Sequence, residues 1–174
     1  EAARLAGYRT ALNQSRKALT EKGKEEAIRI IETTELKNDR VLVVYLPDCH
    51  ESLAGIIAGR IREKYHRPAF VLTGGETSAK GSGRSIESYS MYEELVKCAD
   101  LMIQFGGHPM AAGLSIEEKN IEEFRRRLNV NCTLTDEELR PKIVIDVPMP
   151  VSYITKELVE QISLLEPFGK GNTK

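Results

Sequence analysis

The stretch from residue 41 to residue 73, VLVVYLPDCHESLAGIIAGRIREKYHRPAFVLT, decides the fold class. It opens with a valine-rich apolar run, Val41 to Leu46, that is typical of a buried strand. An apolar stripe with helical spacing follows between Leu53 and Tyr65, and Ala69 to Thr73 is a second apolar run. This order of strand, helix and strand predicts a crossover connection, and therefore two parallel neighbours in one sheet.

The segments that follow predict more strands and helices around this pair. Three further strands are expected at Gly81 to Ile86, Leu101 to Phe105 and Ala112 to Ile116. Two helices are expected from capping boxes: one from Ser90 and Glu93 to about Ala99, the other from Ser115 and Glu118 to Asn129. The sequence thus predicts an α/β fold, a three-layer domain with a mixed sheet of about five strands flanked by helices.

The composition divides the chain into three parts. Residues 1–36 are rich in Ala, Leu, Lys and Glu and predict a connecting helix, in which Gly23 is a candidate break. Residues 37–130 form the central domain. Residues 131–174 begin with a polar, turn-prone linker and continue as the truncated start of a following domain, with a strand at Lys142 to Val147 and a helix from the cap Thr155 to about Leu165. We therefore expect the chain to be a piece of a longer protein.

A glycine-rich string lies in the central domain: Gly106-Gly107-His108-Pro109-Met110-Ala111-Ala112-Gly113. We expect it to be a loop after the preceding strand. Glycine lets a backbone approach a ligand closely, and His108 is the one side chain of the string able to donate a hydrogen bond. The pattern favours a phosphate or a nucleotide as ligand. A glycine turn with an incidental histidine is the alternative for Gly-Gly-His taken alone.

A second cluster lies upstream, at Lys80-Gly81-Ser82-Gly83-Arg84-Ser85. Arg84 carries a planar fork of donors that matches a phosphate bidentately. In an extended segment the side chains of Ser82 and Arg84 share one face. The alternative for this segment alone is a flexible loop with a solvated arginine.

The two clusters together resemble a known group of enzymes. Gly-Gly-His-x-x-Ala-Ala-Gly resembles the signature of the C-terminal domain associated with DHH phosphoesterases. Lys80 to Ser85, Leu12 to Arg16, His50 to Ile56 and Leu164 to Asn172 resemble segments of the RecJ family, the single-stranded-DNA-specific 5′→3′ exonucleases of that superfamily. The glycine string is also similar to that of oligonucleotide and cyclic-dinucleotide phosphodiesterases and of alanyl-tRNA synthetases.

The resemblance implies a substrate-binding role for this chain. It implies that single-stranded DNA is bound opposite a two-metal DHH domain that precedes this chain and holds Mn²⁺ or Mg²⁺, in an enzyme of DNA repair and recombination. The phosphate-binding residues it implies are Ser82, Gly83, Arg84, Gly106, Gly107, His108 and His50.

The chemistry of hydrolysis itself is not expected in this chain. Asp48-Cys49-His50 is the nearest string to Asp-His-His, and one cysteine interrupts it. We therefore expect no metal, no cofactor and no catalytic residue here, with His108 as a possible contributor, and no nuclease activity from the fragment alone. The alternatives are a fragment of a DHH-family oligoribonuclease or cyclic-dinucleotide phosphodiesterase, and a non-catalytic module that binds nucleic acid or phosphate.

Overall composition excludes several other classes. The 174 residues carry a net charge of −1, so global charge does not indicate a nucleic-acid binder. Cys49, Cys98 and Cys132 are odd in number and lack CxxC spacing, which argues against disulfides and a cysteine zinc site and fits the cytoplasm. No apolar run has the length of a membrane span, so no membrane partner is expected.

Overall fold

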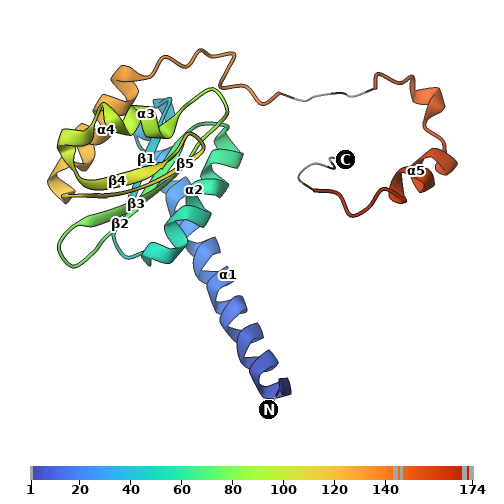
Figure 1. The fold of residues 1–174 in the computed structure, drawn as a ribbon, viewed down its shortest axis with the longest axis horizontal. Coiled ribbons are helices and arrows are strands. Elements are labelled where there is room, and N and C mark those ends of the chain that lie inside the picture. The colour runs from blue at the N-terminus through green and yellow to red at the C-terminus, as the bar shows by residue number, and fades with distance from the viewer. Residues whose placement is uncertain (1, 143–144, 146, 170–171, 173–174) are drawn as a thin grey trace. The chain divides into compact units, whose positions relative to one another are not determined.

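The computed structural model describes residues 2–142, 145, 147–169 and 172. Contacts divide the chain into two compact units, Glu1–Pro141 and Lys142–Lys174. The first unit holds one open five-stranded sheet (Figure 1), formed by β1 (Leu42–Leu46), β2 (Ala69–Thr73), β3 (Ala79–Arg84), β4 (Met102–His108) and β5 (Ala111–Ile116). The strand order is β1-β2-β3-β5-β4. Only β1 and β2 are parallel, so the predicted mixed sheet and its parallel pair are confirmed.

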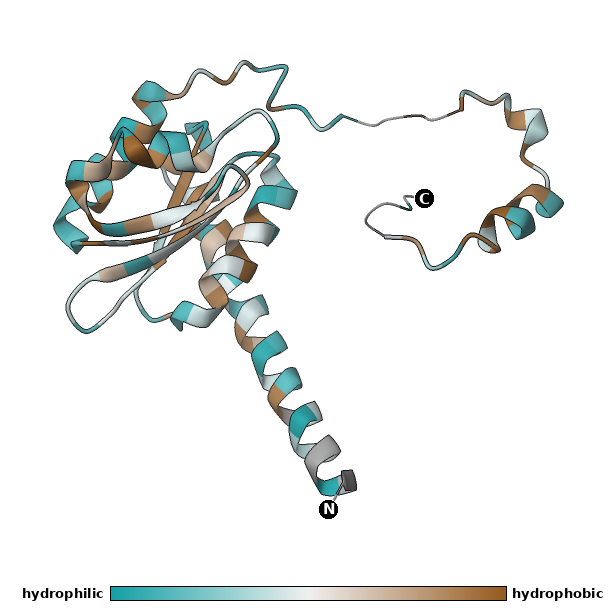
Figure 2. Cartoon of the chain, in the orientation of Figure 1, coloured by the Kyte–Doolittle hydropathy of each residue, from teal (hydrophilic) through white to brown (hydrophobic). Residues whose placement is uncertain are grey.

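Helices cover both faces of the sheet. They are α1 (Ala2–Thr33), α2 (Glu51–Tyr65), α3 (Met91–Val96) and α4 (Ile121–Asn131), with the 3-10 turns η1 (Glu35–Asn38), η2 (Ala99–Leu101) and η3 (Glu118–Asn120) between them. Figure 2 shows hydrophobic and hydrophilic residues interspersed along these helices.

The hydrophobic core is correspondingly split into two buried clusters. Side chains of α1 and α2 pack with Leu42 and Val44 of β1 on one face. Side chains of α3 and α4 pack with Val43 of β1 and Phe70 of β2 on the other. Successive strand residues point to opposite faces, so one apolar run such as β1 supplies both clusters. The three-layer prediction is therefore confirmed.

Gly23, the candidate break of the first helix, does not interrupt it, because α1 is continuous from Ala2 to Thr33. A Cβ added at Gly23 would lie 2.6 Å from Cδ1 of Ile57 on α2. Gly23 therefore permits a close helix–helix approach. The helix ends where Thr34 caps η1, with its side chain accepting from the amide of Leu36.

The expected helix cap at Ser115 is also wrong. Ser115 lies within β5, where it pairs with Lys80 on one side and Gln104 on the other. These tertiary strand pairings override the local capping pattern, and α4 starts at Ile121 after η3. Ser90 does occupy the N-cap of α3, but its side chain makes no capping hydrogen bond, and α3 ends at Val96, before Ala99.

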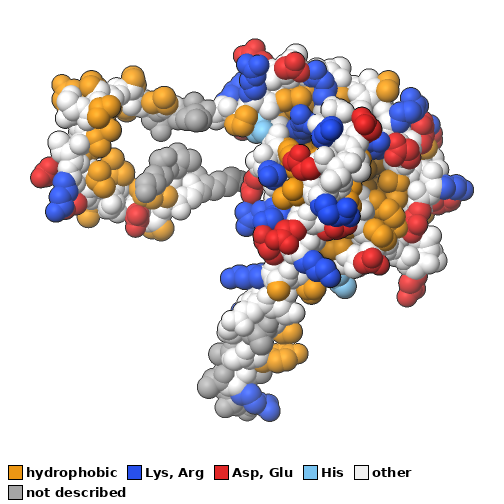
Figure 3. Space-filling view, turned by 180° about the vertical axis from the view of Figure 1, so that it is seen from behind, with side chains coloured by type: hydrophobic (Ala, Val, Ile, Leu, Met, Phe, Trp, Pro, Cys, Tyr) orange, Lys and Arg blue, Asp and Glu red, His pale blue; other side chains and the backbone are white. Residues whose placement is uncertain are grey.

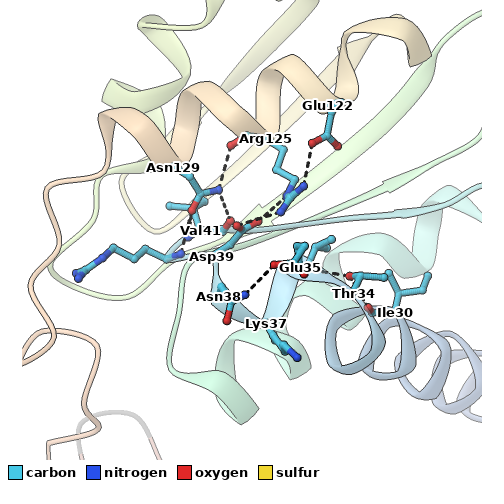
Figure 4. Close-up of polar contacts among 12 residues, drawn as sticks. Ile30, Thr34, Glu35, Lys37, Asn38, Asp39, Val41, Glu122, Arg125 and Asn129 are labelled. Carbon is cyan, nitrogen blue, oxygen red and sulfur yellow. Dashed lines mark hydrogen bonds and ion pairs between the residues drawn. The ribbon is translucent and has the colours of Figure 1, made fainter.

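One side-chain amide joins α4 to the outer edge of the sheet beside β1 (Figure 4). The Oδ1 atom of Asn129 accepts from the backbone amides of Arg40 and Val41, at 2.9 and 3.0 Å, and its Nδ2 donates to the Val41 carbonyl at 2.9 Å. Asn129 thus makes hydrogen bonds to the backbone of this edge that a neighbouring strand would otherwise make. One turn earlier, Arg125 pairs with Asp39, and this half-buried contact raises the pKa of the Arg125 guanidinium.

The second unit contains η4 (Val151–Tyr153) and α5 (Lys156–Ser163). The predicted cap is confirmed, since the Thr155 hydroxyl accepts from the amide of Leu158 at 3.2 Å. Half of the predicted strand from Lys142 to Val147, residues 143, 144 and 146, lies outside the described residues. Hydrophobic side chains stand on the surface of this unit (Figure 3), including Val151 and Leu164, which are 82% and 83% exposed. In the part of the chain described, no helix is both long and apolar enough to cross a membrane.

Candidate functional site

The Gly-Gly-His string forms the end of a strand, and the expectation of a loop is wrong. Gly106, Gly107 and His108 belong to β4 and pair with residues of β5 after a reversal at Pro109 and Met110. Gly107 has a φ of +152°, and a Cβ there would lie 2.4 Å from the Ala111 carbonyl oxygen. Glycine is therefore needed at Gly107 for the reversal itself.

The antiparallel strands β3, β5 and β4 lie side by side and place the two predicted clusters together. Residues directly opposite one another in such a ladder have their side chains on the same face. One face therefore carries three rows across the strands, which we call the open face: Arg84, Ala111 and His108; Ser82, Gly113 and Gly106; and Lys80, Ser115 and Gln104.

This face is covered by α2 over β3 but left uncovered over β4. Helix α2 packs against β2 and β3, whereas Gln104, Gly106 and His108 of β4 are exposed. A hollow of about 660 Å³ lies at the boundary between the part of the open face that α2 covers and the exposed part on β4. Its walls include Glu51 and Ser52 at the start of α2, and its floor includes Gly106 and Gly113.

Two glycines of the open face have no packing reason to be glycine. A Cβ added at Gly106 would meet nothing within 4 Å, and one at Gly113 would meet only the Gly81 carbonyl oxygen at 3.8 Å. The described residues therefore leave room for side chains at both positions. A bare backbone here permits close approach by a molecule outside this chain.

Arg84 is held in place by hydrogen bonds and has no carboxylate partner among the described residues. Its Nη1 donates to the Ser82 hydroxyl at 3.1 Å and to the Gly83 carbonyl at 2.7 Å. Gly55 of α2 makes room for it, since a Cβ there would lie 2.7 Å from Nη2 of Arg84. Within the described residues, no carboxylate lies within 4.0 Å of its guanidinium nitrogens. A half-buried, pre-oriented guanidinium of this kind suits an anion.

His108 is arranged as a hydrogen-bond donor toward solvent. Its Nδ1 accepts from the backbone amide of Met110 at 3.2 Å. In the neutral ring the proton is then on Nε2, an assignment that follows from this hydrogen bond. The exposed side chain can therefore donate to a ligand.

The remaining predicted site residues lie elsewhere. His50 is the N-cap of α2, with its Nδ1 accepting from the Ser52 amide at 3.2 Å, and it lines a separate hollow beside α1. Gly83 faces the opposite side of the sheet, where a Cβ would lie 2.6 Å from Phe70 and from Met91. The ligand-binding roles of all seven residues stay predictions.

The third row of the open face adds Gln104 and Ser115, which no sequence pattern singled out as ligand-binding residues, to Lys80 of the second cluster. Gln104 and Ser115 are cross-strand neighbours, and the Nζ of Lys80 lies 2.8 Å from a carboxylate oxygen of Glu51. The alternation that places Ser82 beside Arg84, and Gly106 beside His108, continues two residues further along each strand. That period-two pattern was the signal that could have found this row.

The described residues do not form a metal centre. Among them, no three side chains of His, Cys, Asp or Glu are grouped so that they could hold an ion. Burial raises the pKa of the Cys49 thiol, which disfavours the thiolate that metal binding requires.

Comparison with known proteins places these features in a family. The DHHA1 domain family matches residues 38–133. The single-stranded-DNA-specific exonuclease RecJ of Bacillus subtilis is 36% identical over 178 residues, which cover 100% of this chain and 22% of the relative. RecJ of Escherichia coli is 36% identical over 180 residues, covering 98% of this chain and 31% of the relative.

A solved structure agrees with the fold. The crystal structure of RecJ in complex with Mg²⁺ from Thermus thermophilus matches with a TM-score of 0.76 and 28% identity, covering 99% of this chain and 27% of that chain. The resemblance to RecJ is confirmed. The chain spans between about a fifth and a third of the length of the relatives cited here.

Proposed function

We propose, from the premise that this chain belongs to the DHHA1 domain family, that it is the substrate-binding part of a single-stranded-DNA-specific exonuclease. Support comes from RecJ relatives that match almost the whole chain at 36% identity. Those relatives are several times longer, so the exonuclease activity is proposed for a longer protein that includes this chain. A role of that protein in DNA repair and recombination belongs to the same proposal.

The observation that carries the proposal is the uncompensated guanidinium of Arg84 beside a bare glycine backbone. Ser82 orients Arg84, and the guanidinium fork binds a phosphate of the strand, which we take to be the 5′-terminal one. His108 donates from Nε2 to the same end of the strand. The glycine row lets the backbone of the nucleic acid lie directly on the sheet.

The hydrolytic step is assigned to a DHH domain elsewhere in the longer protein. Solved RecJ structures contain Mg²⁺ or Mn²⁺, and we propose that the metal is held by that domain. When bound, such ions activate water and stabilise charge on the phosphate. This chain contributes binding and orientation of the strand.

The proposal extends to the division of the chain. Residues 1–36 connect to the DHH domain, residues 37–130 bind the substrate, and residues 131–174 lead into a following, oligonucleotide-binding domain. The second compact unit, Lys142–Lys174, supports a separate last part, whereas residues 131–141 belong to the first compact unit.

The test is a titration of this chain with single strands that carry a 5′-phosphate or a 5′-hydroxyl, at one salt concentration. Arg84→Ala should weaken binding of the phosphorylated strand about 10- to 100-fold, the size of a charge-assisted bidentate contact. Arg84→Lys should recover part of that loss, because lysine lacks the fork. Arg126→Ala is the matched control, since Arg126 is exposed on α4 at the other face of the sheet.

If Arg84→Ala weakened binding of the 5′-phosphate and the 5′-hydroxyl strand equally, Arg84 would not recognise the 5′ end. We also expect the chain alone to release no nucleotides from single-stranded DNA in the presence of Mn²⁺. Nucleotide release that survives further purification and stops with a chelator would contradict the assignment of hydrolysis to another domain.

A further inference from the structure

We propose that Lys80, Gln104 and Ser115 form a second subsite, which binds a downstream part of the strand that Arg84 holds by its end. Lys80 contacts a downstream phosphate, and Gln104 and Ser115 hydrogen-bond to the adjoining nucleotide. The inference rests on the proposed function, because it requires a strand to lie on the open face.

The geometry separates this subsite from Arg84 by more than one nucleotide unit. Lys80 and Arg84 are four residues apart on β3. At about 3.4 Å per residue, their Cα atoms lie about 14 Å apart. Successive phosphates of a stacked strand rise about 3.4 Å each, so the four phosphates of a 5′-phosphorylated tetranucleotide span about 10 Å. The long side chains of Lys80 and Arg84 cover the remaining distance, whereas the single phosphate of a mononucleotide cannot contact both residues.

A hollow extends from the second subsite to the glycine row that lies next to the row of Arg84. Gln104, Ser115 and Lys80 line its far end, and Gly106 and Gly113 form the floor between that end and the row of Arg84. Its volume, about 660 Å³, lies in the range of small-molecule sites. Within the described residues, no hydrogen bond engages the side chains of Gln104 and Ser115, so both can bind a ligand.

At this end of the hollow, a phosphate can replace Glu51 as the partner of Lys80. Lys80 pairs with Glu51 at 2.8 Å, and both side chains are more than half exposed, at 54% and 52%. This contact raises the pKa of Lys80 and lowers the pKa of Glu51, so both are charged at neutral pH. An exposed pair contributes little stability, so a phosphate can compete for Lys80. The N-terminus of α2, at the same wall, also favours an anion.

The experiment measures binding of thymidine 5′-monophosphate and of a 5′-phosphorylated tetrathymidylate to this chain over a series of salt concentrations. Lys80→Met should weaken tetranucleotide binding about fivefold and leave the mononucleotide unchanged. It should also reduce the slope of log affinity against log salt by about 0.7, the value for one phosphate contact on a single strand. Lys97→Met, at the C-cap of α3 on the other face of the sheet, is the matched control.

Two further variants separate binding from structure. Glu51→Gln should tighten tetranucleotide binding about threefold, because it frees Lys80 and removes a charge that repels phosphate. Gln104→Ala should weaken tetranucleotide binding without changing the salt slope, because glutamine is uncharged. If the Lys80–Glu51 pair served structure alone, Glu51→Gln would not tighten binding.

The outcomes distinguish this inference from the proposed function. If Arg84→Ala weakens both ligands while Lys80→Met changes neither affinity nor slope, the second subsite is wrong and the proposed function stands. If the chain binds neither ligand, or Arg84→Ala changes nothing, the proposed function fails and the second subsite fails with it.

Discussion

At the scale of single residues, the glycines of this chain serve different physical purposes. Gly107 is needed for its positive φ, Gly55 makes room for Arg84, and Gly106 borders open space. The sequence alone treats these positions alike, because what a Cβ would meet depends on neighbours far along the chain. Substitution by alanine separates the three purposes.

Gly55→Ala should weaken phosphate binding and leave the fold intact. Its Cβ would lie 2.7 Å from Nη2 of Arg84, so the guanidinium must move, whereas alanine favours the helix by about 1 kcal/mol. We expect about fivefold weaker binding of a 5′-phosphorylated strand, measured by titration. Gly59→Ala on the same helix meets nothing within 4 Å and is the control. Unchanged binding by Gly55→Ala would show that Arg84 does not act from this position.

Gly107→Ala should reduce stability, whereas Gly106→Ala should reduce binding. Gly107→Ala should reduce the free energy of unfolding by about 2–3 kcal/mol, because of the positive φ and the contact with the Ala111 carbonyl. Gly106→Ala should unfold like the wild type but bind a phosphorylated strand about tenfold more weakly, since a methyl group then stands on the open face. Chemical denaturation and titration measure the two effects. If Gly106→Ala bound the phosphorylated strand normally, Gly106 would not be part of the binding site.

At the scale of elements, local patterns predicted the strands and helices whose partners are also local. The run from Val41 to Thr73 folds as β1, α2 and β2 because apolar periodicity, an N-cap and Pro68 agree there. Predictions failed where strand pairing competes with a local signal. The glycines of β4 indicated a loop, and Ser115 indicated a helix cap, but pairing with β5 and β3 extends both segments.

Asn129→Ala should loosen the attachment of α4 to the sheet. The substitution removes three hydrogen bonds to Arg40 and Val41, so we expect a loss of about 2–4 kcal/mol in the free energy of unfolding. Urea denaturation measures it, with the exposed Asn38→Ala as a control. If the loss of unfolding free energy were no larger than that of Asn38→Ala, water would satisfy the backbone of Arg40 and Val41 as well as the Asn129 side chain does.

At the scale of the whole molecule, part of the candidate site was predictable and part was not. Ser82, Arg84 and His108 stand out by residue type beside glycines. Lys80, Gln104 and Ser115 join them only through the register of three strands, and the partners Lys80 and Ser115 are 35 residues apart in sequence. Residue type identifies candidates, whereas long-range register decides which of them meet.

A chain ending at Pro141 should fold as the full chain does. Every buried residue of the two hydrophobic clusters lies before Pro141, and the compact units divide there. We expect the midpoint of thermal unfolding to stay within about 2 °C of the full chain, measured by calorimetry. A shift of more than about 5 °C, or loss of the cooperative transition, would show that residues 142–174 stabilise the first unit.

The place of β4 at the margin of the sheet also bears on solubility. A strand with unpaired backbone groups on one side is a template on which a second chain can add, and this leads to aggregation. The bulge between Met102 and Gln104 interrupts the ladder, and the two glycines lower the tendency of the strand to pair. The features that open β4 to a ligand thus also make it a poor surface for self-association.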